Sequence, residues 1–339
     1  MILPASFGKY RGEINAELKQ VLGGRQSPLY DMMRYHLGWI DEKGNPLRDS
    51  TGKALRPTLC LLACEVAGGD YRRALPAAAA IELVHNFSLI HDDIQDDDTE
   101  RRHQPTVWSI WGKPQAINAG TAMRLLSNVA LLRLNQYDIS LEKRLRAQCL
   151  IDETSLNLIE GQYLDINYET RFDITVADYL DMIEKKTAML LACSLETGAL
   201  LGTDDECLIS RLRSIGLNLG LAFQIVDDVL GIWGDEETTG KPQGNDIRRR
   251  KKTFPIVCIL EETSDGFREE LIRIYRNGTG DSVAEVLQIL ESIDARSRAK
   301  KMAERYCDEA IKEINCLSVP SSAKQALEEI ACFLVRRNF

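Results

Sequence analysis

Several classes of protein are excluded by what this chain of 339 residues lacks. It has no long apolar run, since stretches such as Leu83 to Ile90 and Ala188 to Leu195 are well short of the roughly 20 residues that span a bilayer. The first 15 residues have no basic region followed by an apolar stretch, as a secretory signal would have. We therefore expect no integral membrane segment.

Positive charge and paired cysteines are also scarce. The 42 Lys and Arg residues are outnumbered by 51 Asp and Glu residues, which gives a net charge of -9. A broad electrostatic grip on nucleic acid is therefore not expected, and any phosphate binding must be local. The nine cysteines are an odd number without a CxxC motif. They indicate reduced thiols in a cytoplasmic protein.

Strand-like patterns are nearly absent as well. Alternating runs rich in Val, Ile and Thr are rare, and apolar residues instead recur at helical spacing, as from Ala299 through Tyr306 to Ile314. The sequence therefore predicts an all-α protein. No repeat, low-complexity segment or linker divides the chain, so we expect a single domain over residues 1–339.

Two predicted helices stand out because they are apolar on more than one face. They cover Pro76 to Asp93 and Ser214 to Leu230. Such helices are typical of the middle of a bundle. Both end in or near paired aspartates, where buried structure and concentrated charge meet.

The first acidic group follows the apolar run of the earlier helix. Asp92 and Asp96 are four residues apart, so on a helix their carboxylates share a face, and Asp93 flanks them. Ligands that are all oxygen favour Mg²⁺, which binds through one or two carboxylates plus substrate phosphate. The alternative interpretation is a solvated acidic helix end.

The second acidic group is the pair Asp227 and Asp228 near the end of the later helix. Two acidic pairs that each close a buried helix can face one another across a bundle. Together they can hold a diphosphate between metal ions.

A third group of residues supplies the positive charge that a bound anion needs. Arginine can hold a phosphate through two hydrogen bonds, while lysine acts as a point charge. Each of these residues alone is more simply explained as a solvated surface residue, and His85 is by periodicity alone a core residue. Taken together, however, the basic residues lie beside glycines and beside the acidic groups. They are Lys53, Arg56, Arg101, Arg102, Lys185, Lys186, Lys241 and Lys251.

In combination, these motifs resemble those of the trans-polyprenyl diphosphate synthases. GKALRP at Gly52 to Pro57 is similar to the family's GKxLRP, and Glu82 to Asp96 is similar to its first aspartate-rich helix. FQIVDD at Phe223 to Asp228 resembles the second such helix. Further matches follow in the same order through almost the whole chain: Arg101-Arg102, Pro105-Thr106, Gly161-Gln162, Lys186-Thr187-Ala188, Thr239-Gly240-Lys241 and Lys251-Lys252-Thr253.

The resemblance implies an isoprenoid synthase fold, a single large helical bundle around a deep central cavity. It also implies a homodimer with three Mg²⁺ ions. The reaction would be the head-to-tail condensation of isopentenyl diphosphate with an allylic diphosphate (dimethylallyl, geranyl or farnesyl). The allylic C–O bond would ionise in a site closed to water, and the isopentenyl double bond would attack the cation.

The resemblance also implies a role for each motif residue. Asp92, Asp96 and Asp227 would be the main metal ligands, with Asp93 and Asp228 supporting them. Thr187 and Gln224 would lie near the carbocation. The residues that bind the substrate diphosphates would be Arg101, Lys186 and Lys241 for the allylic substrate, and Lys53, Arg56, His85 and Arg102 for isopentenyl diphosphate, with Lys251 as a further basic residue of the site.

Several positions depart from the family pattern. The second motif usually reads DDxxD, but Gly231 replaces its last aspartate. Asp235, four residues further on, either supplies the missing oxygen or is a solvated loop residue. His103 and Arg250 stand where glycine is common, and Thr121 stands where aspartate is common. These departures bear on the number of metal ions and on loop shape more than on the reaction class.

Two other functions remain open from the sequence. A class I terpene cyclase ionises the same kind of substrate, and Asp227, Asp228 and Asp235 fall at the acidic positions of its second motif. A cyclase needs no isopentenyl site, so the basic residues around Arg56 count against it. A non-catalytic regulatory subunit of a prenyl synthase would be expected to lose an aspartate motif, and this chain has both.

Product length is predicted from the residues about one turn before Asp92. The growing tail would run beside that helix, so the ring of Phe87 would block it where Ser88 would let it pass. A single aromatic at this position resembles geranylgeranyl diphosphate synthases and predicts a product of twenty carbons. Farnesyl diphosphate is the alternative, if Met123 or Leu126 on a facing helix raises the floor.

Overall fold

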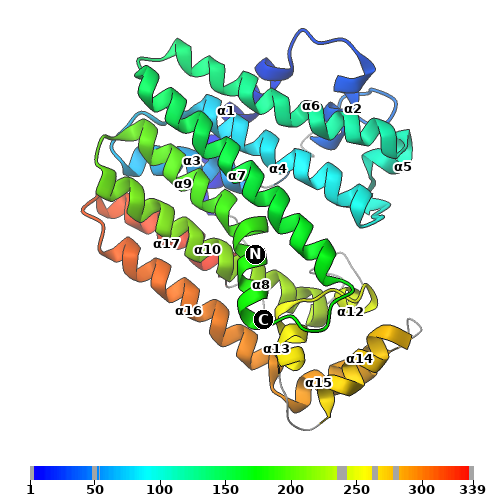
Figure 1. Ribbon diagram of the computed structural model, residues 1–339. Coiled ribbons are helices and arrows are strands. Elements are labelled where there is room, and N and C mark those ends of the chain that lie inside the picture. The colour runs from blue at the N-terminus through cyan, green and yellow to red at the C-terminus, as the bar shows by residue number, and fades with distance from the viewer. Residues whose placement is uncertain are drawn as a thin grey trace.

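The computed structural model describes residues 4–47, 52, 54–234, 243–261, 266–277 and 282–335. The prediction of an all-α protein is confirmed, because helices follow one another along the whole described chain (Figure 1). The only ladder within these residues joins two strands of two residues each.

The helices, turns and strands have the following bounds. The α-helices are α1 (Ala5–Leu22), α2 (Pro28–His36), α3 (Leu55–Val66), α4 (Leu75–Gln95), α5 (Val107–Trp111), α6 (Lys113–Leu132), α7 (Leu141–Tyr168), α8 (Val176–Ile183), α9 (Met189–Gly202), α10 (Glu206–Trp233), α12 (Asn245–Arg248), α13 (Phe254–Glu261), α14 (Phe267–Asn277), α15 (Val283–Ser292), α16 (Ala295–Asn315) and α17 (Ser321–Val335). The remaining elements are the 3₁₀ turns η1 (Tyr71–Ala74) and η2 (Arg133–Gln136), the π-helical turn η3 (Glu184–Ala188), and the strands β1 (Glu100–Arg101) and β2 (Gln104–Pro105).

The two segments predicted to be apolar on several faces form α4 and α10. Residues Ala77 to Ile81 of α4 are fully excluded from solvent, and so are Ile215 and Ile225 of α10. α4 packs on α6 and α3, while α10 packs on α9 and α16. Figure 1 shows α4, α9 and α10 running through the middle of the bundle, with α6 on one side and α16 on the other. This packing brings the acidic ends of α4 and α10 to the interior of the protein.

Within the described residues, α10 is the helix that is long and apolar enough to cross a membrane. However, 61% of its apolar stretch is buried inside the protein. A core helix of a folded domain passes the same test of length and composition. The apolar character of α10 is therefore explained by its packing against α9 and α16.

The short hairpin after the first acidic group has an unusual turn. β1 pairs antiparallel with β2, and the two residues between them, Arg102 and His103, have φ angles of 54° and 60°. Hairpins of this length favour such left-handed conformations, which glycine adopts most easily. This explains why glycine is common where this chain has His103. Arg250, the other departure of this kind, also has a left-handed φ of 56°.

We predict that His103→Gly increases the free energy of unfolding by about 1 kcal/mol, because a left-handed conformation strains any residue that has a Cβ atom. Thermal or denaturant unfolding would measure the change. His103→Ala is the matched control and should give no gain, since alanine keeps the strain. An unfolding midpoint for the glycine variant at or below that of the unmodified protein would contradict the prediction.

Candidate active site

The first acidic group lies where α4 ends. Asp92 is within the last turn of α4, and Asp96 follows as its C-terminal cap, with its backbone N–H donating to the Asp92 carbonyl at 2.8 Å. Both side chains are partly buried. Burial raises the pKa of Asp92, Lys186 opposes this rise, and the neighbouring Asp96 adds to it. The two carboxylates therefore crowd negative charge into a poorly solvated place.

Asp93, the third member of this group, turns away from them into the protein. It is 1% exposed, and both Nε and a terminal nitrogen of Arg101 lie 2.7 Å from its Oδ1. Burial raises the pKa of Asp93 to about 6, although Arg101 opposes the rise. Asp93 and Arg101 thus hold one another, and the hairpin that carries Arg101 is tied to the end of α4.

Two lysines neutralise the carboxylates that face the site. Lys251 Nζ lies 3.2 Å from Asp96 Oδ2. Lys186 forms an ion pair with Asp165 of α7, and Asp92 and Asp96 also lie in its electrostatic neighbourhood. Burial alone would raise the pKa of Asp165, but Lys186 and Lys251 outweigh it and lower that pKa. Asp165 is thus a further acidic residue of the site.

Asp165 was not among the predicted site residues, although the sequence carries a signal for it. Asp165 lies one helical turn beyond the motif Gly161-Gln162. A single carboxylate on a long helix with many charged residues does not stand out until its partner is known.

The π-helical turn η3 places Lys186 and Thr187. A Cβ atom on Gly161 of α7 would lie 2.3 Å from the backbone N of Lys186, and one on Gly220 of α10 would lie 2.4 Å from the Cα of Ala188. Two neighbouring helices therefore touch the backbone of η3 directly. Single π turns inside helices are frequent at functional sites.

The two aspartates of the second acidic group have different surroundings. Asp228 is 6% exposed, and both of its oxygens accept hydrogen bonds from within the protein. Burial raises the pKa of Asp228 to about 7, while the hydrogen bonds from Tyr179 and the Phe254 N–H lower it. Asp227 is less buried, and its charge helps to hold Arg56 protonated. The charge of Asp227 thus acts on Arg56, while Asp228 is enclosed in the core.

Segment 245–251 connects the two acidic groups. Arg249 donates to the Asp96 carbonyl at 2.7 Å and pairs with Asp98 at 2.5 Å. Asp246 lies at the other end of the segment, beside α10. Its Oδ2 would be only 1.9 Å from a Cβ atom on Gly231. The carboxylate nearest the place left by the missing aspartate is therefore Asp246, whereas Asp235 lies outside the described residues.

A separate basic cluster lies beside the middle of α4. An Arg56 nitrogen is 3.2 Å from His85 Nε2. Burial and the charge of Arg56 lower the pKa of His85 well below its ordinary value, so this histidine is neutral. Arg102 extends over Gly52, where a Cβ atom would lie 2.9 Å from its guanidinium. The structure thus brings Arg56, His85 and Arg102 together, while Lys53 and Lys241 lie outside the described residues.

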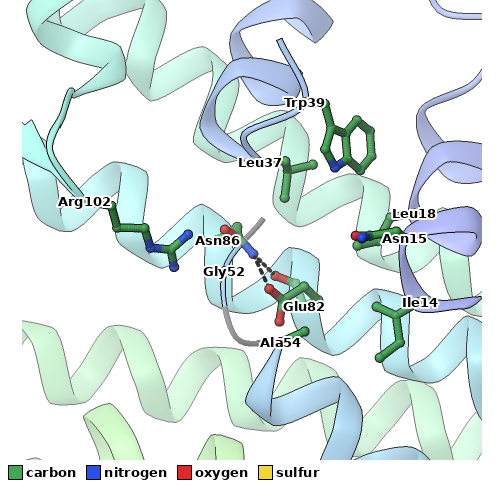
Figure 2. A pocket seen from close by; sticks show the side chains of 10 residues that line it. All are labelled: Ile14, Asn15, Leu18, Leu37, Trp39, Gly52, Ala54, Glu82, Asn86 and Arg102. Atoms are coloured by element: carbon green, nitrogen blue, oxygen red, sulfur yellow. Dashed lines mark hydrogen bonds between the residues drawn. The ribbon is translucent and has the colours of Figure 1, made fainter. Parts of the chain in front are cut away.

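A small cavity adjoins this cluster. Figure 2 shows Glu82 and Asn86 joined by hydrogen bonds, with Arg102 reaching toward them from the opposite wall. The cavity measures ≈ 20 Å³, which is about the space of one water molecule. It therefore extends the polar surroundings of Arg102 without adding room for a second large ligand.

The arrangement fits a magnesium site that is completed by substrate. Within the described residues, no three His, Cys, Asp or Glu side chains already stand together as a metal-binding group. The available donors are carboxylate oxygens, and Mg²⁺ commonly takes one or two of these together with phosphate oxygens and water. Lys186 and Lys251 now balance the same carboxylates. A bound metal and diphosphate would replace those lysine contacts.

Proteins of known activity resemble the chain over nearly its whole length. It is 39% identical over 329 residues to (2E,6E)-farnesyl diphosphate synthase of Mycobacterium tuberculosis, which covers 96% of this chain and 90% of the relative. It is 36% identical over 341 residues to geranylgeranyl diphosphate synthase of the same species, with coverage of 97% and 95%. The crystal structure of polyprenyl synthetase from Streptomyces coelicolor superposes with a TM-score of 0.89 at 37% identity, covering 98% of this chain and 99% of that one.

A further solved structure shows a related protein with bound metal. Polyprenyl synthase from Caulobacter crescentus, complexed with calcium and isoprenyl diphosphate, has a TM-score of 0.84 at 27% identity and covers 98% of this chain and 96% of that one. The family model described as polyprenyl synthetase matches residues 38–293. The chain therefore belongs to the polyprenyl synthetase family of prenyltransferases.

Proposed function

We propose that this prenyltransferase condenses isopentenyl diphosphate with allylic diphosphates to give geranylgeranyl diphosphate. One observation carries the proposal. Asp92 and Asp96 at the end of α4 lie beside Lys186 and Lys251, and Arg56, His85 and Arg102 form a second group of basic residues beside the middle of the same helix. Two substrates that each carry a diphosphate need two such anion sites, one of them with metal.

In this proposal Asp92, Asp96 and Asp227 hold Mg²⁺, and three ions is the expected number. When bound, Mg²⁺ supplies positive charge that stabilises the departing diphosphate. Asp246 replaces Asp235 as the first candidate for the carboxylate that Gly231 lacks, because Asp246 lies against Gly231. Lys186 and Lys251 lie beside these carboxylates and oppose part of their charge before any bond breaks.

The protein's own residues then guide the reaction. Lys186 and Lys251 orient the allylic diphosphate, while Arg56 and Arg102 hold isopentenyl diphosphate so that its double bond can approach the allylic carbon. The allylic C–O bond breaks, its electrons leave with the diphosphate, and the double bond forms the new C–C bond. The resulting cation loses a proton to the released diphosphate. Burial of the surrounding helices excludes water, which would otherwise capture the cation.

We predict that Asp92→Ala lowers kcat by roughly 10³-fold, because its carboxylate stabilises charge that develops in the transition state. The fold should survive, since removing one of several crowded carboxylates relieves repulsion. The measurement is product formation from isopentenyl and farnesyl diphosphates at saturating Mg²⁺, with thermal unfolding as the check on folding. Asp308→Asn, on the exposed face of α16, is the control and should behave as the unmodified protein. Turnover of Asp92→Ala near that of the control would refute the assignment.

The proposed product length rests on Phe87. Its ring is 4% exposed and meets the ring of His91 edge-on at 5.7 Å, on the side of α4 where His91 packs against Gly120 of α6. Ser88, one turn before Asp92, donates to the His85 carbonyl at 2.8 Å. Phe87 is thus a large side chain one turn deeper than the metal ligands. Since both a farnesyl and a geranylgeranyl synthase are similar to this chain, farnesyl diphosphate is the alternative product.

We predict that Phe87→Ala shifts the products to more than twenty carbons, because removing the ring opens space beside α4. Mass analysis of the products would measure the shift. Phe87→Leu keeps most of the side-chain volume and should leave the main product unchanged. If the alanine variant gives the same product distribution as the unmodified protein, Phe87 does not set the length.

A homodimer is the proposed assembly. All the large apolar side chains that are exposed within the described residues lie on two neighbouring helices, α6 and α7. Exposed apolar side chains gathered on two adjacent helices are typical of a protein interface, and a second copy would cover them symmetrically. The residues are Ile117, Leu125, Val129, Leu132, Leu141, Leu145, Leu156, Ile159, Tyr163 and Ile166.

We predict that the unmodified protein sediments as a dimer and that Leu156→Glu, at a site 55% exposed in one copy, shifts it toward the monomer. A charge buried at the interface without a partner is costly. Gln325→Glu, on the exposed part of α17, is the control and should stay dimeric. Sedimentation equilibrium would measure the masses, and a monomeric unmodified protein would refute the assembly.

A further inference from the structure

A chain of hydrogen bonds runs from η3 through α10 to α8 and α13. The Thr187 hydroxyl lies 2.8 Å from Gln224 Oε1, and Gln224 Nε2 lies 3.0 Å from Asp228 Oδ1. Asp228 Oδ2 then accepts from the Tyr179 hydroxyl at 2.5 Å and from the Phe254 N–H at 2.8 Å. Five residues from four parts of the sequence are thus joined in one network.

When Asp228 is ionised, its chemistry fixes the direction of every bond in this chain. A carboxylate only accepts, so Gln224 must turn its NH₂ group toward Asp228. The amide oxygen of Gln224 then faces Thr187, and the Thr187 hydroxyl must donate its single hydrogen to that oxygen. As a result, both lone pairs of the Thr187 oxygen remain available to a neighbouring group.

This direction matters because of where Thr187 stands. It immediately follows Lys186, whose ammonium group lies among Asp92, Asp96 and Asp165. An allylic cation formed beside these groups is stabilised by lone pairs that face it and destabilised by a hydroxyl hydrogen that points toward it. The orientation of one hydrogen at Thr187 therefore changes the sign of its interaction with the cation.

We propose that Asp228 is a positioning residue that sets the polarity of the Thr187–Gln224 pair, and that it acts through these hydrogen bonds instead of as a metal ligand. The inference rests on the proposed function, since it takes the carbocation to form beside Thr187. It explains why the two adjacent aspartates differ, because Asp228 spends both oxygens on internal donors while Asp227 is the more exposed of the two. It also gives Tyr179 a role, since its hydroxyl and the Phe254 N–H hold the carboxylate in place.

The experiment reverses the polarity and then restores it. In Asp228→Asn, the Phe254 N–H can only donate, so it keeps the amide oxygen on its own side and the new NH₂ group faces Gln224. Gln224 must then turn over, and Thr187 must accept from it. In the double variant Asp228→Asn with Gln224→Glu, the asparagine donates to the glutamate, which accepts again from Thr187. The double variant therefore has the net charge of the unmodified protein and the same bond direction at Thr187, while the bond between residues 224 and 228 is reversed.

At pH 8 and saturating Mg²⁺, we expect Asp228→Asn to lower kcat by about 100-fold, the size of effect seen when one stabilising dipole is lost. The KM for each substrate and the Mg²⁺ concentration for half-maximal rate should change less than about threefold, because binding is not altered. The kcat of the double variant should be at least about tenfold higher than that of Asp228→Asn. A large rise in the Mg²⁺ requirement of Asp228→Asn, or a folded double variant no faster than the single one, would overturn the inference.

Two controls separate this outcome from other failures. Thermal unfolding reports whether each variant folds. If Asp228→Asn does not fold, the kcat of the double variant, in which every hydrogen bond has a partner, tests the inference by itself. Asp92→Ala is assayed alongside. If Asp92→Ala retains turnover, the proposed site itself is wrong. If Asp92→Ala is inactive while Asp228→Asn turns over normally, only the role of Asp228 is refuted.

Discussion

The structure depends on one electrostatic constraint, the concentration of carboxylates at the ends of two buried helices. Charges this close repel one another strongly where little water screens them. The protein meets the constraint with Lys186 and Lys251, each of which lies among several carboxylates. The π turn carries Lys186, and segment 245–251 ends in Lys251. Each of these elements therefore places a positive charge beside the carboxylates. Substrate and metal binding is therefore an exchange of one set of counter-charges for another.

Much of this could be predicted from the sequence, because it depends on local spacing. The helical period identified the all-α fold, and the spacing of Asp92 and Asp96 placed them together at the end of α4, with Asp96 as its C-terminal cap. The directions in which adjacent side chains point were harder to predict from the sequence. Asp93 and Asp228 look like second copies of their neighbours, yet each points into the protein, because consecutive side chains on a helix are about 100° apart around its axis. Which of the two faces inward is decided by distant partners, such as Tyr179, which is 49 residues away from Asp228.

The departures from the family pattern show a second limit of sequence reading. His103 and Arg250 replace common glycines, but the backbone keeps the left-handed conformations that those glycines would suit. The fold overrides the local preference, at the cost of some strain. At Gly231 the reverse holds, since the lost side chain leaves room that the Asp246 carboxylate fills. The first change could be read from the sequence as a strained turn, whereas the second depends on a contact that only the folded chain reveals.

The contact of η3 with Gly161 and Gly220 limits how this enzyme can diversify. At both contacts one backbone already touches another, so α7 and α10 cannot move closer to η3, and no side chain there can be trimmed to gain space. The separation of α7 and α10 from η3 is consequently fixed at the level of Lys186 and Thr187. Along α4 and α6, the proposed product would instead meet exchangeable side chains, and both Phe87 and Met123 are buried there. On the proposed function, substitutions along α4 and α6 can therefore change the length of the product more easily than substitutions at Gly161 and Gly220 can change the space around Lys186.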